Sequence, residues 1–153
     1  ADQWSELTLT SMNPGDGNSF MGPLVRVSKT ATSRYELAKI SPIGTGSPSL
    51  GLFKIVAGVQ TQLGSIIIVT MNPGDKLKLA VQGSNLTCYI NGVHLPALDF
   101  TDSDIATGFP GFFVQSNSVA NVTSTLWAGG SVSIPSASSI AWVNRHHSFI
   151  NKR

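Results

Sequence analysis

The sequence has few charged residues, one cysteine and no long apolar run. Asp, Glu, Lys and Arg make up only 12% of the 153 residues, about half the usual share for a soluble domain. The single cysteine, Cys88, excludes a disulfide within the chain. No apolar stretch is long enough to span a membrane, and the first residues lack the basic and apolar regions of a signal peptide. We therefore expect one compact domain that does not insert into a membrane.

The charges that are present are unevenly distributed. Residues 1–135 carry seven basic and all eight acidic residues, a balance of −1, whereas residues 136–153 carry three basic residues and no acidic one. A nearly neutral body argues against nucleic-acid binding, which needs a basic surface. The sequence also lacks a Gly-x-Ser-x-Gly elbow, a phosphate-binding glycine loop and the Cys/His spacing of a zinc site. We therefore expect no nucleic-acid partner and no catalytic centre of these kinds.

What the sequence does contain is a series of short alternating stretches. In residues 76–82, Leu77, Leu79 and Val81 alternate with polar or small residues, so the three apolar side chains should point into a core. About ten such stretches follow one another, with turn signals at intervals of about ten residues. Two of these signals, Ala57-Gly58 and Asn91-Gly92, predict hairpin turns. No stretch of twelve residues shows a helical period. This pattern predicts an all-β fold, an antiparallel sandwich or barrel.

Four details of this pattern make specific predictions. Cys88 alternates with apolar neighbours, which predicts a buried thiol. The run SIIIVT at residues 65–70 is continuously apolar, which is typical of a strand covered on both faces. Arg26 stands among apolar strand residues and should point outward. Residues 34–40 alternate without a clear inward face, so their orientation stays open.

The pentapeptide MNPGD occurs twice, at residues 12–16 and 71–75. Each copy follows a predicted strand, and the sequences diverge after it, which argues against a duplicated domain. Pro fixes φ at about −65° at the second position of Asn-Pro-Gly-Asp, and Gly supplies a positive φ at the third, as a type II turn requires. We interpret the repeat as one turn used at two strand junctions. A paired calcium or ligand loop is the alternative.

The most specific stretch lies between residues 74 and 111. Its landmarks, in chain order, are Gly74-Asp75, Leu77-x-Leu79, Tyr89-x-Asn91-Gly92 and Gly108-x-Pro110-Gly111. This order resembles the concanavalin A-like lectin and glucanase domains, in particular their laminin G-like jelly rolls. The resemblance implies a jelly-roll β-sandwich at residues 1–130. Residues 131–153 lie outside it, and from their composition we expect a linker and a non-sheet C-terminal tail.

The resemblance also carries expectations about edges and partners. Such domains usually begin with one or more further strands before the position of Ala1. From this difference we expect an open sheet edge that another polypeptide completes, either a cleaved N-terminal piece or a neighbouring subunit.

Two functions follow from the resemblance. The first is a non-enzymatic surface recognition module with carbohydrate as its ligand, located outside the cell, on a cell surface or on a virion. The alternative is a structural assembly protein, such as a virion decoration, fibre or filament subunit. It would form homo-oligomers through the sheet edge left by the missing strand and through the tail. Glucanases of this fold resemble one another in a Glu-x-Asp-x-x-Glu strand, and retaining hydrolysis needs two carboxyls about 5 Å apart. That motif is absent here. The two glutamates, Glu6 and Glu36, lie in different predicted strands and are interpreted as solvated strand residues, so we expect no enzyme.

Glycan-binding surfaces on sandwiches combine aromatic platforms with amide or carboxylate neighbours. The predicted ligand-binding residues are Trp4, Tyr35, Tyr89 and Asn91. Phe112 and Trp127 are aromatic as well, but they fit better as core residues.

Three aspartates, Asp99, Asp102 and Asp104, lie close together in the segment LDFTDSD. Calcium binds clustered oxygen ligands, so this segment is a candidate calcium site. Aspartate is also an ordinary turn residue, which is the alternative interpretation. No other cofactor is expected.

The last residues combine a linker-like start, rich in Ser, Pro and Ala, with apolar and basic residues. We expect this segment to be held either by the surface of its own domain or by a partner. The predicted contact residues are Trp142, Arg145, His146, Phe149 and Ile150.

Overall fold

The computed structural model describes residues 2–12, 19–41, 48–115 and 122–131. Within these ranges the chain forms strands and one short 3-10 helical turn. In chain order they are β1 (Gln3–Met12), β2 (Ser19–Val27), β3 (Arg34–Ser41), β4 (Ser49–Val56), β5 (Val59–Ile68), β6 (Lys76–Gln82), β7 (Asn85–Ile90), β8 (Val93–His94), η1 (Pro96–Leu98), β9 (Phe100–Thr101), β10 (Phe109–Gln115) and β11 (Val122–Ser131). The all-β prediction is confirmed. No helix in the described ranges is long and apolar enough to cross a membrane.

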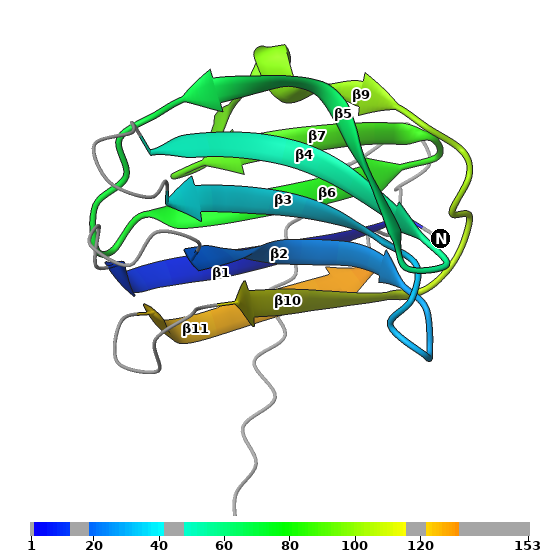
Figure 1. Cartoon of the computed structure of the whole chain (residues 1–153), viewed down its shortest axis with the longest axis horizontal. Coiled ribbons are helices and arrows are strands. Elements are labelled where there is room, and N and C mark those ends of the chain that lie inside the picture. Colours follow the sequence, from blue (N-terminus) through cyan, green and yellow to red (C-terminus); the bar gives the residue numbers. More distant parts are fainter. Residues whose placement is uncertain (1, 13–18, 42–47, 116–121, 132–153) are drawn as a thin grey trace, which may run out of the picture.

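The strands form two antiparallel sheets packed face to face (Figure 1). One sheet has the order β11-β1-β6-β7-β8, with β9 also pairing with β7, and the other has the order β10-β2-β3-β4-β5. Strand β1 is an interior strand, because Leu7 pairs with Trp127 of β11 on one side and with Leu77 of β6 on the other. Strands far apart in sequence thus become neighbours, as in the predicted jelly-roll sandwich. At one side of the sandwich both sheets end, with β10 and β11.

The core lies between the sheets and follows the alternation of the strands. Leu77, Leu79 and Val81 are fully buried, as predicted. The open question about β3 is resolved, because Tyr35 and Leu37 belong to the same core cluster and Glu36 therefore lies on the outer face. Burying one such leucine side chain contributes about 1.5–3 kcal/mol to folding. The alternating positions therefore account for much of the driving force.

The thiol of Cys88 is buried in this core, which confirms the prediction. Burial raises the pKa of the thiol, and the negative charge of Asp99 raises it further. A thiol that stays protonated is a poor nucleophile. Cys88 therefore serves as a small core residue.

The predicted turns are present. Both residues of the Ala57-Gly58 and Asn91-Gly92 turns have positive φ, between 51° and 85°, as a type I′ hairpin requires. At the second MNPGD copy the N–H of Asp75 donates to the carbonyl of Asn72 (3.1 Å), and Gly74 has a φ of 97°. These are the features of the predicted type II turn. Residues 13–16 of the first copy lie outside the described residues.

Two local predictions were wrong. The run at residues 65–68 continues β5, which is an edge strand, so Ile66 and Ile68 are 43% and 78% exposed instead of covered on both faces. Arg26 is buried instead of pointing outward. Its φ of 54° interrupts the regular alternation of β2, and its guanidinium donates to the carbonyls of Ile105 (2.7 Å) and Gly83.

Candidate functional site

The outer face of the five-stranded sheet carries a groove of about 550 Å³, which we call the sheet groove. It runs across strands β10, β2, β3, β4 and β5. Its lining residues are Phe20, Ala31, Thr32, Arg34, Glu36, Ala38, Phe53, Ile55, Gly58, Gln60, Phe113 and Gln115.

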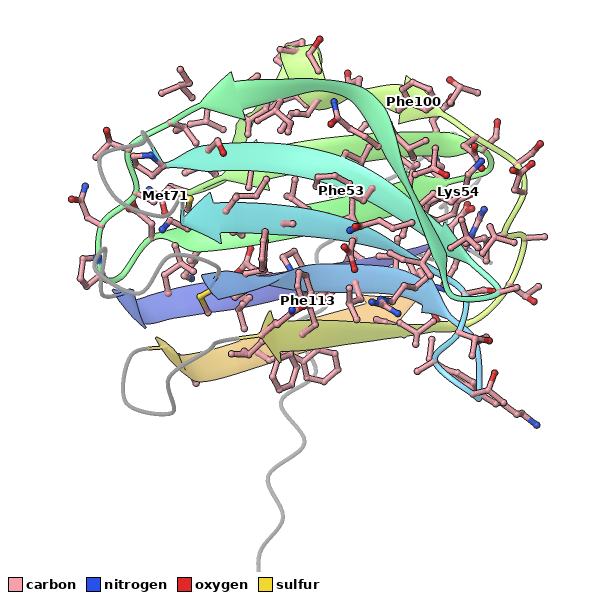
Figure 2. All side chains as sticks on the ribbon, viewed as in Figure 1. Phe53, Lys54, Met71, Phe100 and Phe113 are labelled. Atoms are coloured by element: carbon pink, nitrogen blue, oxygen red, sulfur yellow. The ribbon has the colours of Figure 1, made fainter. Side chains whose placement is uncertain are left out.

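Small residues lie between two aromatic side chains of the sheet groove. Phe113 on β10 pairs with Gly22, and Ala38 on β3 pairs with Gly51 on β4. A Cβ added at Gly51 would lie 2.8 Å from Cε2 of Phe53, so the missing side chain makes room for the Phe53 ring over this glycine. Figure 2 labels Phe53 and Phe113, which project from strands separated by β2 and β3. The two rings therefore lie on either side of a shallow stretch of the sheet groove that is formed by small residues.

A polar cluster adjoins the rings. The buried carboxylate of Glu36 accepts hydrogen bonds from Nε of Arg34 (3.1 Å) and Nε2 of Gln60 (2.8 Å). Burial raises the pKa of Glu36, and the opposing effects of Arg34 and Gln60 offset this only in part. The ionised carboxylate is therefore held at a net cost, as is common at functional sites.

Glu36 positions two groups that remain able to bind. Arg34 also donates from Nη1 to the carbonyl of Ala31 (2.9 Å). Within the described residues, Nη2 of Arg34 and Oε1 of Gln60 have no hydrogen-bond partner. The sheet groove thus offers a donor and an acceptor beside two aromatic rings, which is the usual composition of a small-ligand site.

Tyr35, a predicted ligand-binding residue, is not at the surface. Its side chain is fully buried, and its hydroxyl donates to Oδ1 of Asp102 (2.5 Å) and accepts from the N–H of Ile105 (3.1 Å). Burial, assisted by Asp102, raises the pKa of Tyr35 to about 12. The structure therefore corrects this prediction, because Tyr35 fixes the loop after β9 and cannot serve as a platform.

Trp4 and Tyr89 come together on the outer face of the other sheet. The Nζ atom of Lys78 lies 5.1 Å from the Trp4 ring centroid and 5.5 Å from that of Tyr89. Both distances are in the range of cation–π attraction. This face is a second aromatic surface. The side chain of Lys78 packs against both rings, and this packing explains why Trp4 and Tyr89 lie close to each other.

Asn91, the fourth predicted ligand-binding residue, braces two turns. Its Nδ2 donates to Oδ1 of Asp75 (2.8 Å), and its Oδ1 accepts from the N–H of Lys76 (2.9 Å). Asp75 also accepts from the N–H of Asn72 (2.7 Å). These hydrogen bonds lower the pKa of Asp75. Both polar groups of the Asn91 side chain are thus engaged within the fold.

The three predicted metal ligands are not brought together as a carboxylate cluster. Asp102 and Asp104 each lie 2.5 Å from Nζ of Lys54, whereas Asp99 lies 2.8 Å from the ring of His94. Burial alone would raise the pKa of Asp102, but hydrogen bonds from Lys54 and Tyr35 outweigh it and the pKa is lowered. Across the described ranges, no group of three or more His, Cys, Asp or Glu residues could hold a metal ion.

Phe112 and Trp127 were expected in the core, and they are 49% and 41% exposed. Their ring centroids lie 5.9 Å apart, and Nε1 of Trp127 donates to Oγ of Ser5 (2.8 Å) and to the carbonyl of Gly111 (3.1 Å). Both belong to the last strand of a sheet. Their exposure therefore reflects the position of β10 and β11 at the edges, which alternation does not reveal.

The two glutamates lie on opposite sides of the sandwich. Glu6 is next to the core residue Leu7 in β1 and faces outward from one sheet, and Glu36 faces outward from the other. They cannot form the carboxylate pair of a retaining glycosidase, which must be about 5 Å apart. The predicted contact residues Trp142, Arg145, His146, Phe149 and Ile150 lie outside the described residues.

Sequence reasoning missed most of the sheet groove. Glu36 was interpreted as a solvated strand residue, and Arg34, Phe53 and Gln60 were not considered. Once Tyr35 and Leu37 are assigned to the core, Arg34 and Glu36 must share the outer face. The alternation of β3 was thus the available signal, but it carried no information about the partners on β4 and β5.

Neither the family models nor the curated proteins contain a match to this sequence. Solved structures do match. The carbohydrate binding module CBM66 from Bacillus subtilis is 18% identical, with a TM-score of 0.67 over 86% of this chain and 76% of that one. Sheep galectin-11, in complex with glycerol, is 9% identical, with a TM-score of 0.58 over 84% of this chain and 89% of that one.

A third similar structure is the GH43 protein BlXynB from Bacillus licheniformis, in a mutant form. It is 13% identical, with a TM-score of 0.61, and the match covers 86% of this chain but only 28% of that longer one. At these identities the likeness concerns the fold. The chain shares with these structures a β-sandwich fold of two antiparallel sheets.

Proposed function

We propose that this chain is a non-catalytic carbohydrate-binding module whose ligand occupies the sheet groove. The observation that carries the proposal is the combination of Phe53 and Phe113 with the cluster of Arg34, Glu36 and Gln60 on one sheet face. Similar structures include a protein described as a carbohydrate binding module and a galectin, which supports this ligand class. As part of the same proposal, the module acts outside the cell, on a cell surface or on a virion.

The chemistry of the sheet groove favours a neutral, hydroxyl-rich sugar. An aromatic ring can pack against the apolar face of a pyranose or furanose, as Phe53 would do here. The free groups of Arg34 and Gln60 can donate to and accept from sugar hydroxyls. Because the guanidinium of Arg34 is already paired with Glu36, the site has no unbalanced charge to attract a polyanion.

The test is a glycan array with the full chain, followed by calorimetric titration of the sugars that bind. Phe53→Ala is the informative variant, and Tyr89→Ala is its matched control, since Tyr89 is an aromatic residue on the outer face of the opposite sheet. Removing a central aromatic contact typically costs about 2 kcal/mol, which is roughly a 30-fold loss of affinity. We expect that loss for Phe53→Ala and an unchanged affinity for Tyr89→Ala.

The opposite pattern would move the site to the face that holds Trp4, Lys78 and Tyr89. Absence of binding to every neutral sugar on the array would remove the proposed function. Retained folding of each variant is checked by its melting temperature.

A further inference from the structure

One side of the sandwich exposes apolar side chains that point between the sheets. Phe112, Val114 and Trp127 are 49%, 43% and 41% exposed. They belong to β10 and β11, which end the two sheets at the same side (Figure 1). We call this surface the open edge.

The open edge has the composition of an interior. Phe112 and Val114 pair with Pro23 and the fully buried Met21 in β2, so they occupy inward positions of β10. Trp127 pairs with the fully buried Leu7. Covering these exposed apolar groups with another apolar segment would stabilise the protein by about 25 cal/mol for each Å² removed from water.

The backbone of the open edge also has unpaired sides among the described strands. Within that part of the chain, β10 is hydrogen-bonded only to β2 and β11 only to β1. Natural proteins usually shield such edges with charged residues, above all lysine. Neither Phe109–Gln115 nor Val122–Ser131 contains a charged residue, so this edge is suited to a further strand.

We propose that residues 140–143 of this chain, Ile-Ala-Trp-Val, form an additional strand that covers the open edge. These residues lie outside the described structure, and they follow β11 after a connection of only eight residues, 132–139. Ile, Trp and Val have high strand propensity, and Ile140 and Trp142 alternate as a half-buried strand requires. This strand would replace part of the non-sheet tail expected from the sequence, and the inference does not depend on the proposed function.

The connection makes the placement feasible. Eight extended residues reach at most about 29 Å, enough for the chain to leave Ser131 and turn back beside β11. Pro135 and four serines in this connection favour a turn over a continued strand. None of residues 132–144 is charged, so packing this segment against the uncharged edge strands would bury no charge. The basic residues, which begin at Arg145, can remain in water.

The experiment is hydrogen–deuterium exchange of the full chain, read by mass spectrometry on peptides that cover residues 122–131. The variants are Ile140→Asp and Trp142→Asp, with Ser138→Asp as a matched control that adds the same charge without removing an anchor. We expect the two anchor variants to raise exchange in β11 about tenfold, with β6 and β7 unchanged and Ser138→Asp equal to the parent. Sedimentation velocity on the same samples should show a monomer throughout.

Two outcomes would overturn the proposal. In one, exchange in β11 is the same in the parent and in both anchor variants, which means that the segment does not cover the edge. In the other, protection of β11 falls on dilution together with the sedimentation coefficient, which means that a second copy covers it. That second result would favour the assembly function over an internal strand.

Discussion

Glu36 provides a test that separates a functional carboxylate from a structural one. Its side chain is only 4% exposed, and it accepts from Arg34 and Gln60. Burial nevertheless raises its pKa above the ordinary value of 4.5. The folded state therefore takes up the proton more readily than the unfolded chain, and ionised Glu36 reduces stability at neutral pH.

The perturbation is Glu36→Gln, which keeps the shape and removes the charge. We expect its free energy of unfolding at pH 7 to equal or exceed that of the parent, because burying the ion costs more than its interactions with Arg34 and Gln60 contribute. As the pH falls from the folded pKa of Glu36 towards 4.5, the parent gains stability from this group. The advantage of the variant therefore shrinks over that window.

Binding should change in the opposite direction. An amide has a single acceptor oxygen and cannot accept from both Arg34 and Gln60 as the carboxylate does. A hydrogen bond to a charged group contributes about 1.5–3 kcal/mol, so loss of this positioning should weaken sugar binding by about 10- to 150-fold. Glu6→Gln, a neutralised glutamate on the opposite sheet, should change neither stability nor binding appreciably.

The assay is urea unfolding between pH 4 and 8, combined with calorimetric titration of a sugar identified on the array. A variant less stable than the parent by more than about 1 kcal/mol at pH 7, with an unchanged pH dependence, would refute the reasoning about burial. Unchanged affinity would show that Glu36 does not position the binding groups.

Three further outcomes can be measured. Tyr35→Phe removes the donor to Asp102 and leaves the N–H of Ile105 without an acceptor, so it should lower stability by about 1–3 kcal/mol in chemical denaturation; an unchanged midpoint would contradict this. Ionised Asp102 stabilises the parent above pH 3.8, and this contribution is lost as the pH falls through the lowered pKa of Asp102. Lys54→Met removes a partner that lowers this pKa, so it should make that contribution smaller, and an acid-unfolding titration checks it. Cys88, the single thiol, should react with a disulfide reagent only after denaturation, and rapid reaction of the native protein would show that the core admits the reagent.

The parts of the fold that could be predicted from the sequence are those that local patterns report directly. Leu77, Leu79 and Val81 alternate because the strand has a period of two, and Asn91-Gly92 has both positive φ values that a tight hairpin requires. Alternation does not state whether a strand is an interior or an edge strand. Ile68 and Trp127 were misjudged for that reason, since β5 and β11 are the last strands of their sheets among the described residues.

The sheet groove was beyond sequence reasoning for a related reason. Phe53 and Phe113 face the same surface only because β4 and β10 belong to one sheet, although the two residues are 60 positions apart in the sequence. Tyr35 shows the reverse case. An aromatic residue with a polar tip fits a surface platform or a buried anchor equally well, and only the position of Asp102 at the end of the core decides between them.

The most direct test of the proposed function is an NMR titration of the isotope-labelled full chain with a neutral oligosaccharide selected on the array. The account predicts saturable shifts of the backbone amides of β3, β4 and β10 that line the sheet groove, centred on Glu36, Phe53 and Phe113. Shifts confined to Trp4, Lys78 and Tyr89, or no saturable shift with any selected sugar, would contradict it.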